Sequence, residues 1–261
     1  TKIICTIGPA SNSPKKLADL AEAGMNIARL NFSHGTHHSH KKIIEQIRKL
    51  NKDRQYPIAI MLDTQGPEIR TGDLEMKLVT GERVSVNTSP NDEKEGLIYV
   101  NYPHLKDDLE IGNSILIDGG LMRLEVLAKT EIGLECEVIY GGLLKGHRHV
   151  NLPGTIVKLP GITETDKKDI LFGIEQNVDT IALSFVRNPE TIREVRDLLG
   201  ESAEHIKLIA KIENQEGVER LEEIVQEADG VMVARGDLGI EVQMEEMPQI
   251  QRQIAFLCAK Y

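Results

Sequence analysis

Short apolar runs alternate with helix-like segments near both ends of the chain. Each run is followed by apolar residues at the three- and four-residue spacing of a helix that buries one face. Parallel strands covered by helices have this alternation, because both faces of such a strand are buried. The predicted strands are residues 3–7, 26–32, 58–62, 180–185, 206–212 and 230–234.

Capping residues mark the ends of several of these helices. Ser13 directly precedes Pro14, a residue that suits the first position of a helix, and Gly24 is a natural C-terminal cap. Thr163, followed by Asp166 three residues later, predicts another helix start. The predicted helices therefore lie between the predicted strands, as a repeating strand–helix unit requires.

The pattern changes between about Thr71 and Pro160. Short segments of alternating polarity are separated there by Gly, Asn and Asp, and none has convincing helical spacing. This stretch predicts an inserted β-rich domain. The predicted division of the chain is the first part of the α/β domain at residues 1–71, the insert at residues 72–160, and the second part of the α/β domain at residues 161–261.

The strand–helix units fit two α/β architectures. A closed (β/α)8 barrel needs eight strands, so about two units would lie beyond Tyr261. An open doubly wound sheet is the alternative, although no glycine-rich dinucleotide fingerprint follows the first strand. Because the chain has no initiator Met and its last helical segment has no stop signal, we expect it to be a piece of a longer polypeptide.

Composition narrows the class of function. The chain has 31 Lys and Arg against 41 Asp and Glu, a net charge of −10, which argues against a nucleic-acid or anionic-membrane partner. No apolar stretch approaches the roughly 18 residues of a membrane span, and no signal pattern opens the chain. The three cysteines match no metal-ligand spacing. We therefore expect a cytoplasmic protein.

Polar residues collect directly after the predicted strands, where a parallel barrel gathers its catalytic groups on one face. Glu213 and Asp237 would suit Mg²⁺, which binds few protein carboxylates together with substrate oxygens. Arg29 and Arg70 would neutralise a phosphate, and Lys211 shares a strand face with Glu213. These are the parts of phosphoryl transfer. The whole set is Thr6, Arg29, Asn31, Ser33, Asp63, Thr64, Arg70, Ser184, Arg187, Lys211, Glu213, Arg235 and Asp237.

Several long motifs resemble those of the pyruvate kinase family. The resemblance covers the whole chain in colinear order, and the motifs support one another. They are TKIICTIGPAS (1–11), GMNIARLNFSHGT (24–36), LDTQGPEIRTG (62–72), VNLPG (150–154), IAKIENQEG (209–217) and VARGDLG (233–239).

The resemblance implies a (β/α)8 TIM barrel that is interrupted after its third strand by a mobile all-β lid domain. It also implies a kinase that transfers the phosphoryl group of phosphoenolpyruvate to ADP, giving pyruvate and ATP in the last step of glycolysis. With about six of the eight barrel strands present, the isolated 261-residue chain is expected to be inactive. The full-length parent is expected to be a homotetramer.

The same resemblance assigns roles to individual residues. The catalytic residues would be Lys211, Arg29 and Arg70, and Mg²⁺ or Mn²⁺ would be held by Glu213 and Asp237. The substrate would contact Arg29, Lys211, Gly236, Asp237 and Ser184. The nucleotide would contact Thr6, Pro9, Asn31, His34, Arg70 and Arg148. K⁺ would be held by Asn31, Ser33, Asp63 and the carbonyl oxygen of Thr64, and a Glu at position 68 goes with K⁺ dependence in the family.

Two other functions stay open at this point. One is another Mg²⁺-dependent barrel enzyme that acts on phosphoenolpyruvate or an oxo acid, and the other is a catalytically inactive scaffold fragment. A histidine run at His34, His37, His38 and His40 could suggest zinc, but solvent-exposed histidines are favoured because no Cys or second cluster accompanies them.

Three smaller features also give expectations. Glu241, Glu245 and Glu246 predict the acidic first turn of a helix. Asp118–Gly119–Gly120 predicts a turn, either a hinge or a plain β-turn. His149 stands where the family usually has Gly, which puts a turn with positive φ in question.

Overall fold

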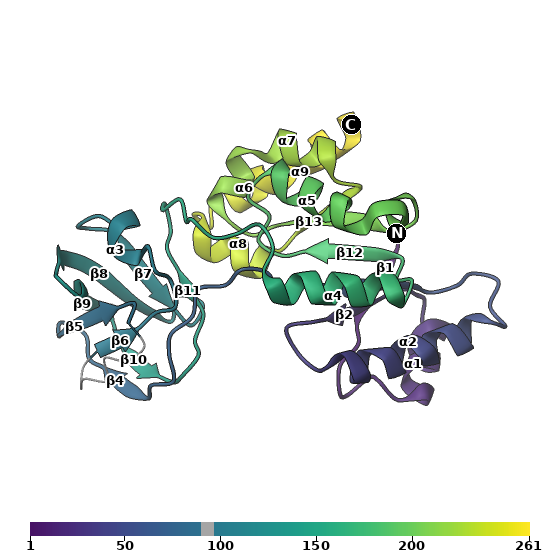
Figure 1. Ribbon diagram of the computed structural model, residues 1–261, viewed down its shortest axis with the longest axis horizontal. Helices are drawn as coiled ribbons and strands as arrows, with labels where there is room; N and C mark the ends of the chain where they lie inside the picture. Colours follow the sequence, from purple (N-terminus) through teal and green to yellow (C-terminus); the bar gives the residue numbers. More distant parts are fainter. Residues whose placement is uncertain (90–96) are drawn as a thin grey trace.

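In the computed structural model, which describes residues 1–89 and 97–261, six parallel strands form one sheet (Figure 1). The strands cross the sheet in the order in which they occur along the chain. A doubly wound sheet would reverse this order at a switch point, whereas sequential order is that of a (β/α) barrel. Of the two predicted architectures, the barrel type is confirmed. Its strands are β1 (Ile3–Thr6), β2 (Met25–Asn31), β3 (Ala59–Asp63), β12 (Thr180–Leu183), β13 (Lys207–Ile212) and β14 (Gly230–Val233).

Helices connect these strands and pack against one another in chain order. Contacts join α1 to α2, α4 to α5, α5 to α7 and α7 to α9. Their inner faces and the strands share an aliphatic core, in which Leu17, Ile44, Ile170 and Ile192 are at most 1% exposed. The helices are α1 (Pro14–Glu22), α2 (His37–Asn51), α4 (Glu164–Glu175), α5 (Pro189–Leu199), α7 (Leu221–Glu227) and α9 (Met247–Lys260).

The predicted helix caps are present. The Ser13 side chain accepts a hydrogen bond from the backbone N–H of Lys16, and Thr163 and Asp166 form a reciprocal capping box. Gly24 follows α1 with a φ of +104°, a backbone conformation that glycine adopts at little cost. These signals are local in sequence, which is why the helix starts could be predicted.

Several short helical segments differ from the prediction. The expected single helix around Val218 to Val225 is divided at Arg220 into α6 (Gln215–Glu219) and α7, and α8 (Arg235–Glu241) and the 3-10 helix η1 (Gly200–Glu204) were not predicted. The predicted acidic first turn is wrong, because Glu241 ends α8. The next residue is extended, and α9 starts later, where Pro248 suits its first turn.

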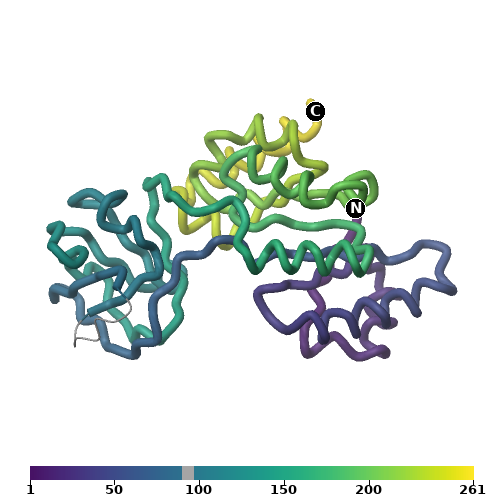
Figure 2. Tube along the Cα trace, in the orientation of Figure 1, coloured from purple at the N-terminus to yellow at the C-terminus, as the bar shows by residue number. Residues whose placement is uncertain are grey.

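A second six-stranded sheet lies between β3 and α4 along the chain and forms a separate lobe of the trace (Figure 2). Its order is β11-β7-β8-β9-β5-β6, and every pair is antiparallel except β5 with β6. A two-stranded ribbon of β4 and β10 accompanies it. It has its own core, in which Ile115, Leu124, Val126 and Val138 are fully buried. The strands are β4 (Met76–Leu78), β5 (Arg83–Asn87), β6 (Leu97–Tyr99), β7 (Ser114–Ile117), β8 (Met122–Lys129), β9 (Gly133–Tyr140), β10 (Gly142–Leu144) and β11 (Val150–Asn151).

The prediction that this stretch has no helix is wrong at one place. The helix α3 (Leu105–Asp108) has four residues, which is too short to give a helical period in the sequence. Its position is set by the fully buried Tyr102, whose hydroxyl donates to Asp108 and accepts from the backbone N–H of Lys158 at 2.7 Å. A side-chain network rather than an amphipathic pattern therefore fixes α3.

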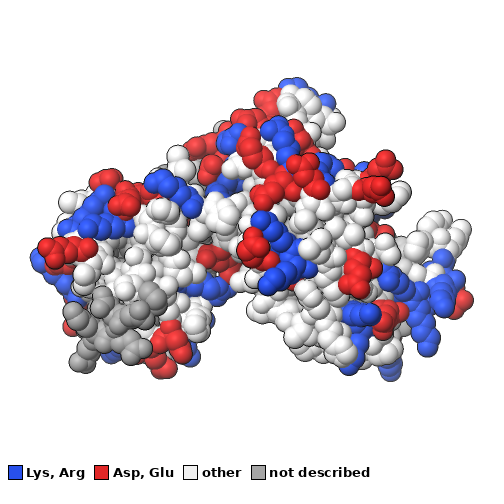
Figure 3. Space-filling model, in the orientation of Figure 1, with Lys and Arg blue, Asp and Glu red and all other residues white. Residues whose placement is uncertain are grey.

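Acidic and basic side chains are mixed over the helices in the upper part of Figure 3. Arg193 of α5 lies 2.6 Å from Glu227 of α7, and Arg196 lies 3.0 Å from Asp229. Such partly exposed surface pairs contribute little to stability. In the described ranges, no helix is both long enough and apolar enough to cross a membrane.

The burial of Cys136 gives a testable property of the second sheet. Burial raises the pKa of this thiol to about 12, so at pH 8 its thiolate should be about a thousandfold scarcer than that of an ordinary cysteine. In the native full-length protein we expect Cys136 to stay unlabelled by an alkylating reagent, and to react within minutes in guanidinium. Peptide mass spectrometry would measure both rates, with the half-buried Cys5 as an internal comparison. Labelling of native Cys136 at the rate of free cysteine would contradict this packing.

Candidate active site

Charged and polar side chains converge at the carboxyl ends of β2, β3, β12 and β13. Asp63, Ser184, Lys211 and Glu213 are all at least 90% buried there, and Arg29 reaches the same place from β2. Strand register accounts for part of this, because Asn31 pairs with Asp63 and Arg29 with Met61 across β2 and β3. Residues far apart in sequence are thereby brought to one level of the sheet.

Asp63 is the centre of this cluster. One of its carboxylate oxygens accepts from Arg29 Nε at 2.5 Å, and the other lies 3.1 Å from Lys211 Nζ. Arg29 also donates from Nη1 to Thr6 Oγ1 at 2.7 Å. A fully buried carboxylate thus links two cations that come from different strands.

The ammonium group of Lys211 contacts three side-chain oxygens. Nζ lies 3.1 Å from both Asp63 and Glu213 and donates to Ser184 Oγ at 2.6 Å. Burial lowers the pKa of Lys211, but the two carboxylates outweigh burial and leave the pKa above its ordinary value. Lys211 is therefore cationic at neutral pH. The predicted proximity of Lys211 and Glu213 is confirmed, whereas the contact with Asp63 was not predicted.

Glu213 is held from two sides. One oxygen faces Lys211, and the other accepts the backbone N–H of Phe185 at 2.7 Å. Phe185 has a φ of +55°, which is uncommon for an aromatic residue, and the conformation directs its N–H at the carboxylate. Gly66 packs beside it, because a Cβ there would lie 2.8 Å from the Cβ of Ser184.

Asp237 lies close enough to Glu213 for the two carboxylates to repel each other. Burial raises the pKa of Glu213, and the charge of Asp237 raises it further, while Lys211 lowers it. Asp237 and Gly236 line one hollow together with Thr6, Arg29, Lys211 and Glu213. Two neighbouring carboxylates with spare lone pairs fit a divalent cation that takes its other ligands from substrate and water. Across residues 1–89 and 97–261, no three His, Cys, Asp or Glu side chains are arranged to hold a metal by themselves.

The four residues expected at a monovalent cation lie at the ends of β2 and β3. Asn31 and Asp63 are register partners, and the side chain of Asn31 accepts the backbone N–H of Ser33 at 3.0 Å. The carbonyl oxygen of Thr64 accepts from Ser184 Oγ at 2.6 Å. The donors are all oxygens, which is the ligand type that K⁺ prefers, and three of them already bind protein groups.

The residues expected at the nucleotide are spread over several segments. Thr6 lines the hollow, and Pro9 and His34 lie on the loops after β1 and β2. Arg70 contacts Glu68 at 2.6 Å and donates to the carbonyl oxygen of His147 at 2.8 Å. Arg148 lies 3.5 Å from Asp118. Both arginines therefore belong to the region where the second sheet joins the first.

Two expectations about histidines are corrected here. His40 is buried rather than exposed: it stacks on Phe32 at 4.1 Å, and its Nε2 lies 2.8 Å from the carbonyl oxygen of His34. His37 pairs with Asp169 at 2.6 Å, so this ring joins α2 to α4. The positive φ expected near His149 falls instead on His147, at +58°.

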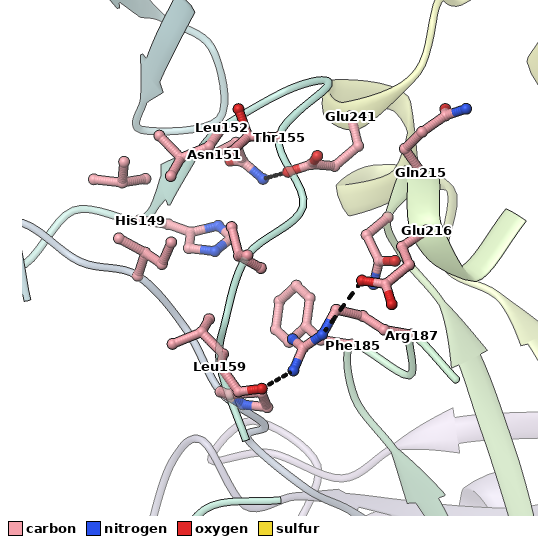
Figure 4. Close-up of a pocket in the computed structure, with 15 residues that line it drawn as sticks. His149, Asn151, Leu152, Thr155, Leu159, Phe185, Arg187, Gln215, Glu216 and Glu241 are labelled. Atoms are coloured by element: carbon pink, nitrogen blue, oxygen red, sulfur yellow. Dashed lines mark hydrogen bonds and ion pairs between the residues drawn. The ribbon is translucent and has the colours of Figure 1, made fainter. Parts of the chain in front are cut away.

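A pocket between the two sheets contains residues whose contacts the sequence did not predict (Figure 4). The buried Arg187 donates to the carbonyl oxygens of Leu159 and Pro160 at 2.6 and 2.8 Å. Asn151 donates from Nδ2 to Glu241 at 2.6 Å, as the dashed line in Figure 4 shows. The signal for Asn151 was its place in the VNLPG motif, and Glu241 gave no signal beyond its charge.

Fold and site together define a (β/α)-barrel protein whose strand ends carry a buried cluster of paired charges. The chain matches the model of the family described as pyruvate kinase, barrel domain, over residues 1–261, and it belongs to the pyruvate kinase family.

Two curated relatives show the extent of this similarity. The pyruvate kinase of Geobacillus stearothermophilus is 50% identical over 264 residues, covering 99% of this chain and 45% of the relative. That of Staphylococcus aureus strain MRSA252 is 47% identical over 267 residues, covering 100% of this chain and 45% of the relative. The chain spans about half the length of the curated relatives it matches.

The central position of Asp63 can be tested through stability. Asp63→Asn removes the charge that partners Arg29 and Lys211, and leaving buried charges uncompensated should cost about 3–5 kcal/mol of unfolding free energy. The control, Glu135→Gln, breaks the more exposed pair with Arg83 and should cost roughly 0–1 kcal/mol. Chemical denaturation of the full-length protein measures both values. Equal losses would show that Asp63 is no more important than a surface carboxylate.

Proposed function

We propose that the protein is a pyruvate kinase, which transfers the phosphoryl group of phosphoenolpyruvate to ADP and gives pyruvate and ATP in the cytoplasm. The observation that carries this proposal is the buried contact of cationic Lys211 with Asp63, Glu213 and Ser184 beside Asp237. Membership of the family supports it. The activity is proposed for the natural full-length protein, as a homotetramer.

In the proposed reaction the bond between phosphorus and the enol oxygen breaks, and a bond forms from phosphorus to the terminal oxygen of ADP. The electron pair stays on the enol oxygen, and the enolate carbon is then protonated to pyruvate. Lys211 stabilises the phosphoryl group in flight, because its ammonium is already oriented by three oxygens. Arg29 neutralises the same group, held in place by Asp63 and Thr6.

Glu213 and Asp237 would hold Mg²⁺ or Mn²⁺. A bound divalent cation would neutralise charge that develops on the phosphate oxygens. Gly236 and Asp237 would receive the substrate carboxylate through their backbone, and Ser184 would orient Lys211.

On the nucleotide side, Arg70 would contact the phosphates. The other contacts would come from Thr6, Pro9, Asn31, His34 and Arg148.

We infer that the second sheet is a lid domain inserted into the barrel, with boundaries at residues 1–71, 72–160 and 161–261. Its separate core supports independent movement, since few apolar contacts would be lost when it shifts. Arg70 and Arg148 lie at the junction, where a closing lid would bring them to the nucleotide.

Lys211 offers a direct test of the chemistry. Lys211→Met should lower kcat by about 10²–10³ or more, because a preorganised cation is removed from the transferring group. Lys207→Met, on the same strand, removes only a surface contact with Asp229 and should leave kcat unchanged. Pyruvate formation from phosphoenolpyruvate, ADP and Mg²⁺ measures kcat, and circular dichroism checks folding. A folded Lys211→Met protein with wild-type kcat would refute the role.

The monovalent cation provides a second test. Because Asn31, Ser33, Asp63 and Thr64 present oxygens at adjacent strand ends and Glu68 lies nearby in sequence, we expect turnover to be several-fold faster in K⁺ than in Na⁺ buffer. Equal rates in the two buffers would rule out the proposed K⁺ activation. No pyruvate in either buffer would instead favour another Mg²⁺-dependent barrel reaction or an inactive scaffold.

A further inference from the structure

One hydrogen bond joins the second sheet to the helix that carries Asp237. Asn151, the last residue of β11, donates from Nδ2 to Oε1 of Glu241, the last residue of α8, at 2.6 Å. Figure 4 shows the two side chains meeting across the pocket, Asn151 from the second-sheet side and Glu241 from α8. The bond therefore spans the boundary between the two cores.

The surroundings of this hydrogen bond make it energetically unfavourable to bury. Asn151 is 4% exposed, and its Oδ1 has no hydrogen-bond partner. Burial raises the pKa of Glu241, while the amide of Asn151 lowers it. A buried carboxylate next to a half-satisfied amide is a poor source of stability compared with an apolar contact. A requirement for position, rather than for stability, accounts for this pair better.

A turn of the second sheet also approaches the same end of α8. In the turn after β7, Asp118, Gly119 and Gly120 all have positive φ, and a Cβ on Gly119 would lie 3.8 Å from Ile240 Cδ1. Because β7 pairs with β11 through Ile117 and Val150, this turn and Asn151 belong to one edge of the second sheet. That edge therefore bonds to Glu241 and lies beside Ile240, the residue before it in α8.

Helix geometry connects this contact to the active site. Asp237 and Glu241 are four residues apart in α8, so they lie on the same face about one turn, or roughly 6 Å, from each other. A short helix moves as a unit, and a shift of Glu241 is passed on to Asp237. Asp237 in turn interacts with Glu213, the other candidate ligand of the divalent cation.

We propose that Asn151 and Glu241 form a catch that places Asp237 in its metal-holding position when the second sheet is seated on α8. The two are positioning residues, which act through the helix and touch neither substrate nor metal. The inference depends on the proposed function for its kinetic consequence, but the catch itself is a property of the protein without ligands.

Exchanging the donor and the acceptor of this bond tests the catch. In Asn151→Asp, two carboxylates face each other and should repel. Adding Glu241→Gln restores the bond in the reverse direction, since the new amide donates to the new carboxylate. Glu241→Gln alone can still accept from Asn151 and should resemble the wild type. Arg83→Gln, which breaks a pair within the second sheet, is the matched control.

Two measurements on the full-length protein separate a catch from a merely structural bond. The first is hydrogen exchange of residues 147–155 and 235–242 without ligands, which should be faster in Asn151→Asp alone. The second is the Mg²⁺ concentration for half-maximal pyruvate formation, which should rise about tenfold in Asn151→Asp and return in the double variant.

Three outcomes would overturn the proposal: an unchanged Mg²⁺ requirement in Asn151→Asp, a double variant no better than the single one, or an equal effect of Arg83→Gln. If Asn151→Asp fails to fold, Glu241→Ala is compared with Glu241→Gln instead. The Mg²⁺ concentration for half-maximal pyruvate formation should then rise in Glu241→Ala and stay near the wild-type value in Glu241→Gln. Absence of pyruvate formation in the wild type would refute the proposed function, whereas the exchange data would still decide whether the catch exists.

Discussion

The buried carboxylate of Asp63 is the interaction on which the candidate site depends. It neutralises Arg29 from β2 and Lys211 from β13, and Lys211 in turn neutralises Glu213. Charges removed from water are tolerated only when they are paired with good geometry. A slip of one residue in any of these strands would leave a buried charge without its partner. The strand register therefore also fixes where the charged groups lie. A sequence that specifies this register specifies the arrangement of the charged groups as well.

The same charge balance orients the two cations that are proposed to meet a phosphate. Arg29 and Lys211 are oriented before any ligand arrives, because Thr6, Asp63, Glu213 and Ser184 already occupy their donors. A phosphate would compete for cations that are fixed in direction, so little energy would be spent on ordering them. The positive φ of Phe185 belongs to this arrangement, since it presents the N–H that holds Glu213.

The sequence predicted what is encoded locally. Strands and helix starts follow from periodicity and from caps such as Ser13 and Thr163, and strand-end positions indicated which side chains converge. Contacts between side chains from segments far apart in the sequence could not be predicted in this way. The pairing of Asp63 with Lys211 depends on which strands are neighbours, the short helix α3 depends on Tyr102, and the partner of Glu241 comes from ninety residues earlier in the chain. The motifs of the family supplied roles for several residues, but no pattern in them describes how Arg70 or Arg148 is held.

Arg70 shows why the junction of the two sheets matters for the proposed chemistry. Its backbone N–H donates to Asn101 Oδ1 at 2.7 Å and its carbonyl accepts from Asn101 N, so the residue is bound to the second sheet. Its side chain contacts Glu68, in the segment after β3, and also donates to the carbonyl oxygen of His147 at 2.8 Å. A shift of the second sheet would therefore change the surroundings of this guanidinium, whereas the partners of Lys211 and Arg29 all lie in the barrel. The three cations proposed to contact phosphate are therefore held differently: Arg29 and Lys211 have their partners in the barrel, whereas Arg70 is bound by groups on both sides of the junction.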